Sequence, residues 1–305
     1  MRYLRVRCAM PEPAQVNVAT GPIARPLRVT SADGATTDLY LIDPAGSVLD
    51  VVLWLPALGV AARNYLAFAD ALAEHGIAVA LHEWRGIGSS DRRARRASDW
   101  GYRELLTLDI PASVAAVRTA WPGARVWLGG HSLGGQLSAL YASLHSGDHA
   151  GLLLIASGAP YWRRFSRPWL IGFFAACVPA IAAACGYFPG RRLRFAGNEA
   201  RGVMTDWART ARSGRYAVDG IDQDIDAALR VLTLPIFALR LQKDWLAPLP
   251  SLQWLLDKMP LAPRRIELIG PNDLDHVSAD HFGWMKSPSL LAGSFAAYLN
   301  GNTQS

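Results

Sequence analysis

The stretch VWLGGHSLGG, residues 126–135, holds a Gly-x-Ser-x-Gly motif. A short apolar run typical of a buried strand precedes the motif, and residues 133–144, with leucines at helical spacing, follow it. A serine at such a strand-to-helix turn projects its hydroxyl above the edge of the sheet. The turn leaves no room for side chains two residues before and after the serine, here at Gly130 and Gly134. The pattern therefore predicts Ser132 as a nucleophile.

The helix after the motif supplies a second chemical group. Backbone N–H groups at a helix N-terminus carry partial positive charge, so the N–H of Leu133 is placed to stabilise an oxyanion that develops beside Ser132. A glycine-rich turn without chemical function and a phosphate-binding turn are the alternative interpretations. The strand before the motif and the helix after it favour catalysis.

Apolar runs alternate with helical patterns along much of the chain. Strands are predicted at 51–55, 77–81, 126–128, 152–156, 235–241 and 265–269, and helices at 65–75, 113–121, 133–144 and 249–259. Two further strands, 27–31 and 38–42, flank Asp33-Gly34 as a hairpin. This order predicts an α/β fold with a mostly parallel central sheet and helices on both faces.

The alternation stops at Ser157-Gly158 and resumes at Pro235. We therefore expect residues 1–158 to form the first part of the core, 159–232 an inserted helical cap, and 233–305 the second part of the core. A chain of 305 residues suffices for one such domain with its insertion.

Composition narrows the possible partners and the compartment. The net charge is +6, but only three of the 31 basic residues are lysines, and the densest arginine run, at 92–96, follows glycines and serines typical of a surface loop. We therefore predict no nucleic-acid partner. Cys8, Cys177 and Cys185 suggest neither a disulfide framework nor a metal site, and the N-terminus lacks the apolar stretch of a secretory signal. These features predict a cytoplasmic protein.

Two further motifs, together with the serine motif, resemble the α/β-hydrolase superfamily, in particular its serine aminopeptidase-like and monoglyceride lipase-like branch. The chain has LPALG at 55–59 and EWRGIGSS at 83–90, and the resemblance runs from about Val51 to the C-terminus. Pro56 and Ala57 stand where this branch usually has His-Gly. The resemblance implies that the loop supplies a second oxyanion donor, which we assign to the N–H of Leu58, with Ala57 as the alternate.

A serine hydroxyl needs a histidine base that is held by a carboxylate. On the fold that the resemblance implies, acid and base follow the serine in that order. Asp244, just after the strand predicted at 235–241, is the expected acid. The loop after the last strand offers His281 and His276 as bases. We favour His281, because His281-Phe-Gly resembles the family's histidine turn.

The most apolar stretch of the chain, residues 169–188, lies inside the expected cap. Its length is near the ~20 residues that cross a bilayer, but a span here would have to leave and re-enter between two strands of one sheet. We interpret the stretch as two short helices, split at Pro179, that roof Ser132. Contact of the cap with a membrane surface is a less favoured alternative. An apolar roof favours substrates with apolar acyl groups, and Trp245 and Trp284 are candidates to line the same pocket.

The leading hypothesis is a serine hydrolase that cleaves a small-molecule carboxylic ester, thioester or amide through an acyl-enzyme. An acyltransferase with the same triad and a non-catalytic binding protein on the same fold remain as alternatives. We expect no cofactor and no metal. The aspartates at 222, 224 and 226 lack the glycine and the final glutamate of a calcium loop, since Ala227 and Thr233 stand there.

Overall fold

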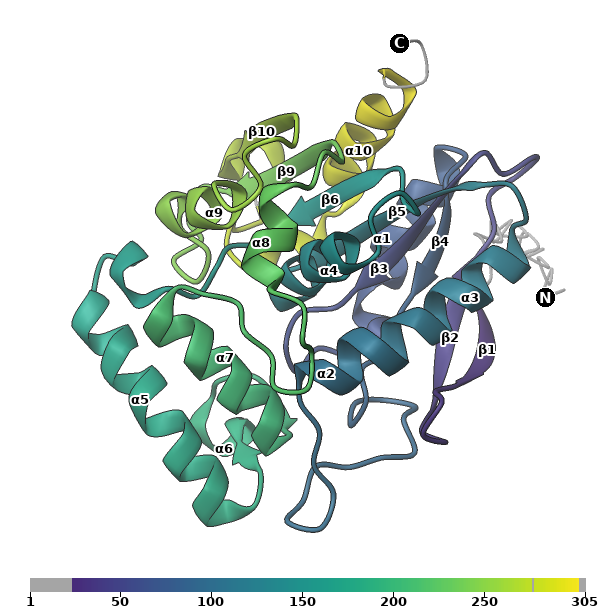
Figure 1. Cartoon of the computed structure of the whole chain (residues 1–305). Coiled ribbons are helices and arrows are strands. Elements are labelled where there is room, and N and C mark those ends of the chain that lie inside the picture. Colours follow the sequence, from purple (N-terminus) through teal and green to yellow (C-terminus); the bar gives the residue numbers. More distant parts are fainter. Residues whose placement is uncertain (1–23, 276, 302–305) are drawn as a thin grey trace, which may run out of the picture.

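The computed structural model describes residues 24–275 and 277–301, which fold around one eight-stranded sheet (Figure 1). The sheet begins with the predicted hairpin, in which β1 (Arg25–Thr30) pairs antiparallel with β2 (Thr36–Ile42). Gly34 turns the chain between them at φ 78°, a conformation that glycine adopts without steric cost.

The other strands form the parallel part of the sheet, where the chemistry-bearing turns lie. They are β3 (Asp50–Leu55), β4 (Ala78–Leu81), β5 (Arg125–His131), β6 (Gly151–Ile155), β9 (Ile236–Leu241) and β10 (Arg264–Ile269). The order across the sheet is β1-β2-β4-β3-β5-β6-β9-β10, with β2 antiparallel to β4 and every later pair parallel. Because β5 is central, the turn that follows it lies at the middle of the strands' carboxyl edge.

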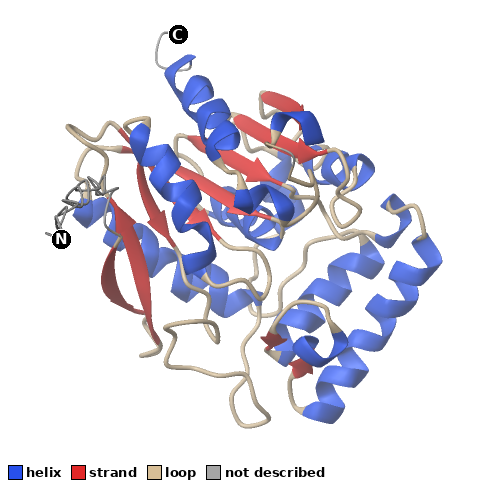
Figure 2. Ribbon diagram, turned by 180° about the vertical axis from the view of Figure 1, so that it is seen from behind, coloured by secondary structure: helices blue, strands red, loops and turns tan. Residues whose placement is uncertain are grey.

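Helices cover both faces of the sheet (Figure 2). One face carries α1 (Leu66–Glu74) and α10 (Ser289–Gly301), and the other carries α3 (Ile110–Ala120), α4 (Leu133–Leu144), α8 (Ile225–Arg230) and α9 (Leu249–Leu256). Strand β3 serves both layers, since Val51, Leu53 and Leu55 pack into one apolar cluster while Val52 and Trp54 pack into the other. The sequence-based expectation of an α/β fold is confirmed.

Short elements complete the fold. They are α2 (Tyr102–Glu104), a wide helical turn at Leu105–Asp109, and 3-10 turns at Ala62–Tyr65, Trp162–Arg164, Pro271–Asp273 and Gly283–Lys286.

A helical region is inserted between β6 and β9. It contains α5 (Pro168–Cys185), α6 (Gly190–Leu193) and α7 (Arg201–Ser213), with a small ladder of β7 (Phe188–Pro189) and β8 (Asn198–Glu199). Figure 1 shows α5 and α7 side by side, away from the helices that cover the sheet. Helix α8, later in the same insertion, packs instead in the core cluster that includes α4.

The expectation of two short helices split at Pro179 was wrong, because α5 is one helix of 18 residues with Pro179 inside it. A proline inside a helix removes one backbone hydrogen bond and crowds the carbonyl four residues earlier, so the helix continues only where packing offsets this cost. Val178, before the proline, and Ala182, after it, pack in the same cluster as Met204 and Ala208 of α7. This shared contact holds both halves of α5 together.

Candidate active site

Ser132 occupies the turn between β5 and α4 in a strained conformation, with φ 55° and ψ −117°. Its backbone is fixed on both sides, since its N–H donates to Ile155 O (3.1 Å) and its carbonyl accepts from Gln136 N (3.2 Å). Non-glycine residues rarely hold a positive φ unless the surroundings enforce it, and such strain gathers at functional turns.

The expectation that Gly130 and Gly134 have no room for side chains is confirmed. A Cβ on Gly130 would lie 2.3 Å from the carbonyl carbon of Gly134, and a Cβ on Gly134 would lie 1.9 Å from Leu55 O. The turn after β5 therefore packs directly against the end of β3.

Asp244 lies just after β9, with its carboxylate almost fully buried. One carboxylate oxygen, Oδ1, accepts hydrogen bonds from the N–H groups of Leu246 (2.9 Å) and Ala247 (3.0 Å). The other, Oδ2, lies 2.8 Å from His281 Nδ1. These two backbone donors fix the carboxylate so that its free oxygen points at the imidazole.

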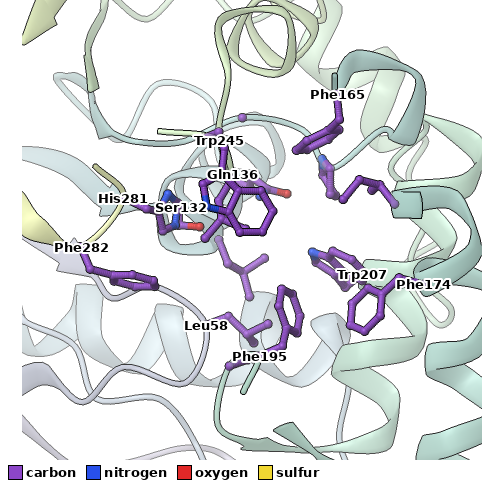
Figure 3. A pocket seen from close by; sticks show the side chains of 18 of the residues that line it. Leu58, Ser132, Gln136, Phe165, Phe174, Phe195, Trp207, Trp245, His281 and Phe282 are labelled. Carbon is purple, nitrogen blue, oxygen red and sulfur yellow. The ribbon is translucent and has the colours of Figure 1, made fainter. Parts of the chain in front are cut away.

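His281 is buried except toward a cavity, which Ser132 also lines. Figure 3 shows the Ser132 hydroxyl and the His281 ring next to each other. Since Nδ1 is engaged by Asp244, the other ring nitrogen, Nε2, remains for an exchange of protons. The structure thus brings the three predicted residues together, whereas the alternate base, His276, lies outside the described residues.

The loop after β3 presents two backbone N–H groups near the cavity, but only one is free. The N–H of Ala57 donates to the hydroxyl of Tyr65 at 2.9 Å. Within the described part of the chain, the N–H groups of Leu58 and Leu133 donate to no other residue, and both residues line the cavity. Leu58 and Leu133 therefore remain as the pair of candidate oxyanion donors.

Tyr65 and His131 were not identified from the sequence as parts of this site. The Tyr65 hydroxyl accepts from the N–H of Ala57 and also forms a hydrogen bond with His131 Nδ1, at 2.8 Å. Burial lowers the pKa of His131 well below its usual range, so the ring is neutral. The contact joins residues 66 positions apart, and no local pattern indicates it.

The cavity has a volume of about 450 Å³ and lies between the core and the inserted region. Core residues supply one wall and the insertion supplies the other, mostly with apolar side chains: Leu58, Leu133, Trp245, Leu246, Ala247 and Phe282 from the core, and Phe165, Leu170, Ile171, Phe174, Phe195 and Trp207 from the insertion. Figure 3 shows Phe174, Phe195 and Trp207 gathered opposite Ser132. An apolar cavity with a few converging polar groups is typical of a small-molecule site.

Of the two tryptophans expected to line the cavity, one does so. Trp245 lines it and is largely exposed. The expectation for Trp284 was wrong, because that side chain is fully buried in the core, edge-on to Phe68 and Trp54. Trp284 is only three residues from His281 in the sequence. The 3-10 turn at Gly283–Lys286, however, directs its side chain into the apolar cluster between the sheet, α1 and α10.

The second sequence motif, at 83–90, supports the fold. Arg85 is buried and forms salt bridges with Asp33 (2.5 Å) and Asp109 (2.6 Å), which tie the first hairpin to the turn before α3. The bond to Arg85 holds the pKa of the Asp33 carboxyl below its usual range. Glu83 accepts from the N–H of Ala62 (2.9 Å), next to the loop that carries Leu58.

The aspartates at 222–226 have structural partners. Asp224 caps α8 by accepting from the N–H of Ala227 (3.0 Å), and Asp226 pairs with Lys258 at 3.0 Å.

Comparison with known proteins connects this geometry to a family. The family model described as serine aminopeptidase, S33, matches residues 46–269. Human monoglyceride lipase is 27% identical over 128 residues, which make up 42% of this chain and 41% of the lipase. The chain thus matches well under half the length of this curated relative.

Solved structures share the fold at low identity. A thermophilic esterase from Thermogutta terrifontis superposes with a TM-score of 0.61 at 17% identity, over 91% of this chain and 99% of the esterase. Est1E from Butyrivibrio proteoclasticus gives a TM-score of 0.57 at 15% identity, over 92% and 99% of the two chains.

Proposed function

The chain belongs to the serine aminopeptidase S33 family of α/β-hydrolases, and from that membership we propose that it is a serine hydrolase acting on carboxylic esters, thioesters or small amides. The observation that carries the proposal is the buried contact between His281 Nδ1 and Asp244 Oδ2, 2.8 Å, at the wall of the cavity that Ser132 lines. The curated relative is a monoglyceride lipase and a protein of the same fold is an esterase, which makes an ester the favoured substrate.

In the proposed reaction, Ser132 Oγ attacks the substrate carbonyl while its proton passes to His281 Nε2. Asp244 stabilises the imidazolium that forms. The N–H groups of Leu58 and Leu133 bind the oxyanion of the tetrahedral intermediate. His281 then protonates the leaving alcohol, thiol or amine, which departs and leaves the acyl group on Ser132. A water molecule, deprotonated by His281, releases the carboxylic acid and restores the serine.

A fluorophosphonate probe tests the nucleophile. The purified chain is expected to form a covalent adduct, which Ser132→Ala abolishes. Ser157→Ala is a matched control, because Ser157 is buried near the same turn but does not line the cavity. Absence of labelling on a folded wild-type chain would contradict the proposal and favour the alternative, a non-catalytic binding protein on the same fold.

The apolar lining of the cavity supports an apolar acyl group on the substrate. Each methylene buried contributes ~0.8 kcal/mol, so kcat/KM is expected to rise about fourfold per methylene until the cavity is filled. A series of nitrophenyl esters of increasing chain length measures this. Equal activity across the series would contradict an apolar acyl site.

Acyl transfer to an alcohol or amine is the second candidate, favoured by the same apolar lining, which disfavours water. Product analysis with a competing alcohol separates the two reactions. A transferase forms the new ester in excess over the acid, and a hydrolase forms mainly the acid.

We also propose that residues 159–232 act as the cap of this site and that the protein works in the cytoplasm. Cys177 and Cys185 are free thiols in the structure, which is compatible with a reducing compartment.

A further inference from the structure

Helix α5 has an outward face of a kind that surface helices seldom have. Trp169, Phe173, Ala176, Ala180 and Ala183 follow one another at helical spacing and are all exposed. The side chains of Trp169 and Phe173 are 79% and 71% exposed, and no charged residue occurs anywhere in the helix. A surface helix normally turns polar residues outward. Apolar side chains of this kind are normally buried, yet no other part of the described structure covers this face.

The helix is not a core element, since only 17% of it is buried. It is the only helix among the described residues that is long and apolar enough to cross a bilayer. A crossing is incompatible with its place in the fold, because the chain enters it from β6 and leaves it toward β9 of the same sheet, and its inner side packs on α7. The exposed face is thus suited to lie on a surface.

The charges around α5 have a single sign. Residues 159–198 contain no aspartate or glutamate and six arginines, all of them exposed: Arg163, Arg164, Arg167, Arg191, Arg192 and Arg194. None forms a salt bridge with another residue in the described ranges. These six charges equal the net charge of the whole chain, +6.

Helix stability does not explain this arrangement. Three of the arginines precede α5, at the end where the helix dipole is positive and where cations are unfavourable. An anionic surface, by contrast, attracts all six. An apolar helix face bordered by arginines matches the pattern of helices that lie in the interface of a bilayer with anionic lipids.

We infer that α5 docks this protein onto the surface of a bilayer containing anionic phospholipid, with Trp169 and Phe173 inserted among the acyl chains and the arginines at the headgroups. Leu170, Ile171 and Phe174 of the same helix line the cavity. A docked α5 would then form the wall between the lipid and the candidate active site. The docking itself does not depend on the proposed catalysis.

The test uses the full chain with Ser132→Ala, so that its outcome is independent of hydrolysis. Sedimentation with vesicles of phosphatidylcholine alone, and of phosphatidylcholine mixed with phosphatidylglycerol, measures binding. We expect binding to the mixed vesicles, weakening as salt is raised. The pair Trp169→Ser with Phe173→Ser should lower it about tenfold or more, since each large apolar side chain contributes strongly when buried.

A control pair removes other largely exposed apolar side chains elsewhere. Val231 and Leu261 are 68% and 59% exposed and lie outside α5, α6 and α7, so Val231→Ser with Leu261→Ser should leave binding unchanged. For the charges, Arg191→Gln with Arg192→Gln should weaken binding to the mixed vesicles, whereas Arg230→Gln with Arg265→Gln, an equal change in net charge, should not.

Three outcomes would overturn the inference. One is equal binding to vesicles with and without phosphatidylglycerol. Another is an equal loss of vesicle binding in the Trp169→Ser, Phe173→Ser variant and in its control, Val231→Ser with Leu261→Ser. The third concerns self-association, measured by sedimentation velocity without lipid. A dimer that dissociates in the Trp169→Ser, Phe173→Ser pair would show that a second copy covers this face.

Discussion

The hydroxyl of Tyr65 accepts a hydrogen bond from the backbone N–H of Ala57 at 2.9 Å. Ala57 was the alternate oxyanion donor, and this bond occupies the N–H that such a role requires. The same hydroxyl forms a hydrogen bond with His131, beside the nucleophile, so one tyrosine links the loop after β3 to the end of β5. The loop that presents the free N–H of Leu58 is thereby held at a fixed distance from Ser132.

Tyr65→Phe is expected to destabilise the protein by about 1–3 kcal/mol, because the buried N–H of Ala57 loses its acceptor. It should also lower kcat, but by less than the about hundredfold or larger loss that follows removal of an oxyanion donor itself. Thermal unfolding and ester hydrolysis measure the two effects. Tyr102→Phe is the control, since the Tyr102 hydroxyl is buried with no partner among the residues described. Equal behaviour of the two variants would contradict a positioning role for Tyr65.

Asp244→Asn is expected to lower kcat about ten-thousand-fold with little change in KM, because the amide no longer stabilises the charged imidazole or selects its tautomer. Asn can still accept from Leu246 and Ala247, so the fold should persist. Asp257→Asn, which changes an exposed carboxylate, should leave kcat and KM unchanged. Steady-state kinetics measures all three proteins. An inactive His276→Ala beside an active His281→Ala would assign the base to His276 instead.

Gly134→Ala is expected to destabilise the protein by about 3 kcal/mol and to abolish probe labelling. The new Cβ would lie 1.9 Å from Leu55 O and 2.6 Å from Pro56 O, so the end of β3 or the serine turn must move. Gly293→Ala in α10 is the matched control, since its Cβ would meet nothing closer than 3.7 Å. That control should gain about 0.5–1 kcal/mol from reduced chain entropy. Full labelling of Gly134→Ala would show that the turn tolerates a side chain.

Glu199, at the end of β8, is buried, and burial raises the pKa of its carboxyl from 4.5 to about 7. A raised carboxyl pKa means that the folded state holds the proton more tightly. The stabilisation that the Glu199 carboxyl contributes is therefore fully present below pH 4.5 and is lost as the pH rises through about 7. Glu199→Gln should remove this loss and stabilise the protein at about pH 8, by at most about 3 kcal/mol, with little effect at about pH 5.

Thermal unfolding at the two pH values checks the Glu199 prediction. Asp222→Asn, which removes an exposed carboxylate that forms no salt bridge among the described residues, serves as the control and should not stabilise the protein at about pH 8. A Glu199→Gln variant that is equally stabilised at both pH values would exclude the titration of this carboxyl as the cause.

Local sequence patterns predicted most of the sheet. The strand expected at 51–55 is observed as Asp50–Leu55, and the helix at 133–144 coincides with α4. The observed ends of some strands differ from the predicted ends. The strand predicted at 126–128, for example, is observed as β5, which continues into the turn as far as His131. The two-helix expectation for α5 failed because the contact of Val178 and Ala182 with α7 outweighs the local effect of Pro179.

The sequence by itself determined the turn that carries Ser132. The spacing of apolar residues on either side indicates a buried strand and a helix, and the two glycines indicate a tight backbone turn between them. It also limited the acid and the base to short loops. Only the tertiary structure placed His281 against Asp244 across 37 residues, turned Trp284 into the core, and engaged Ala57 with Tyr65. These contacts depend on strand register and on which face each turn presents, and that information is shared among distant segments rather than contained in any one of them.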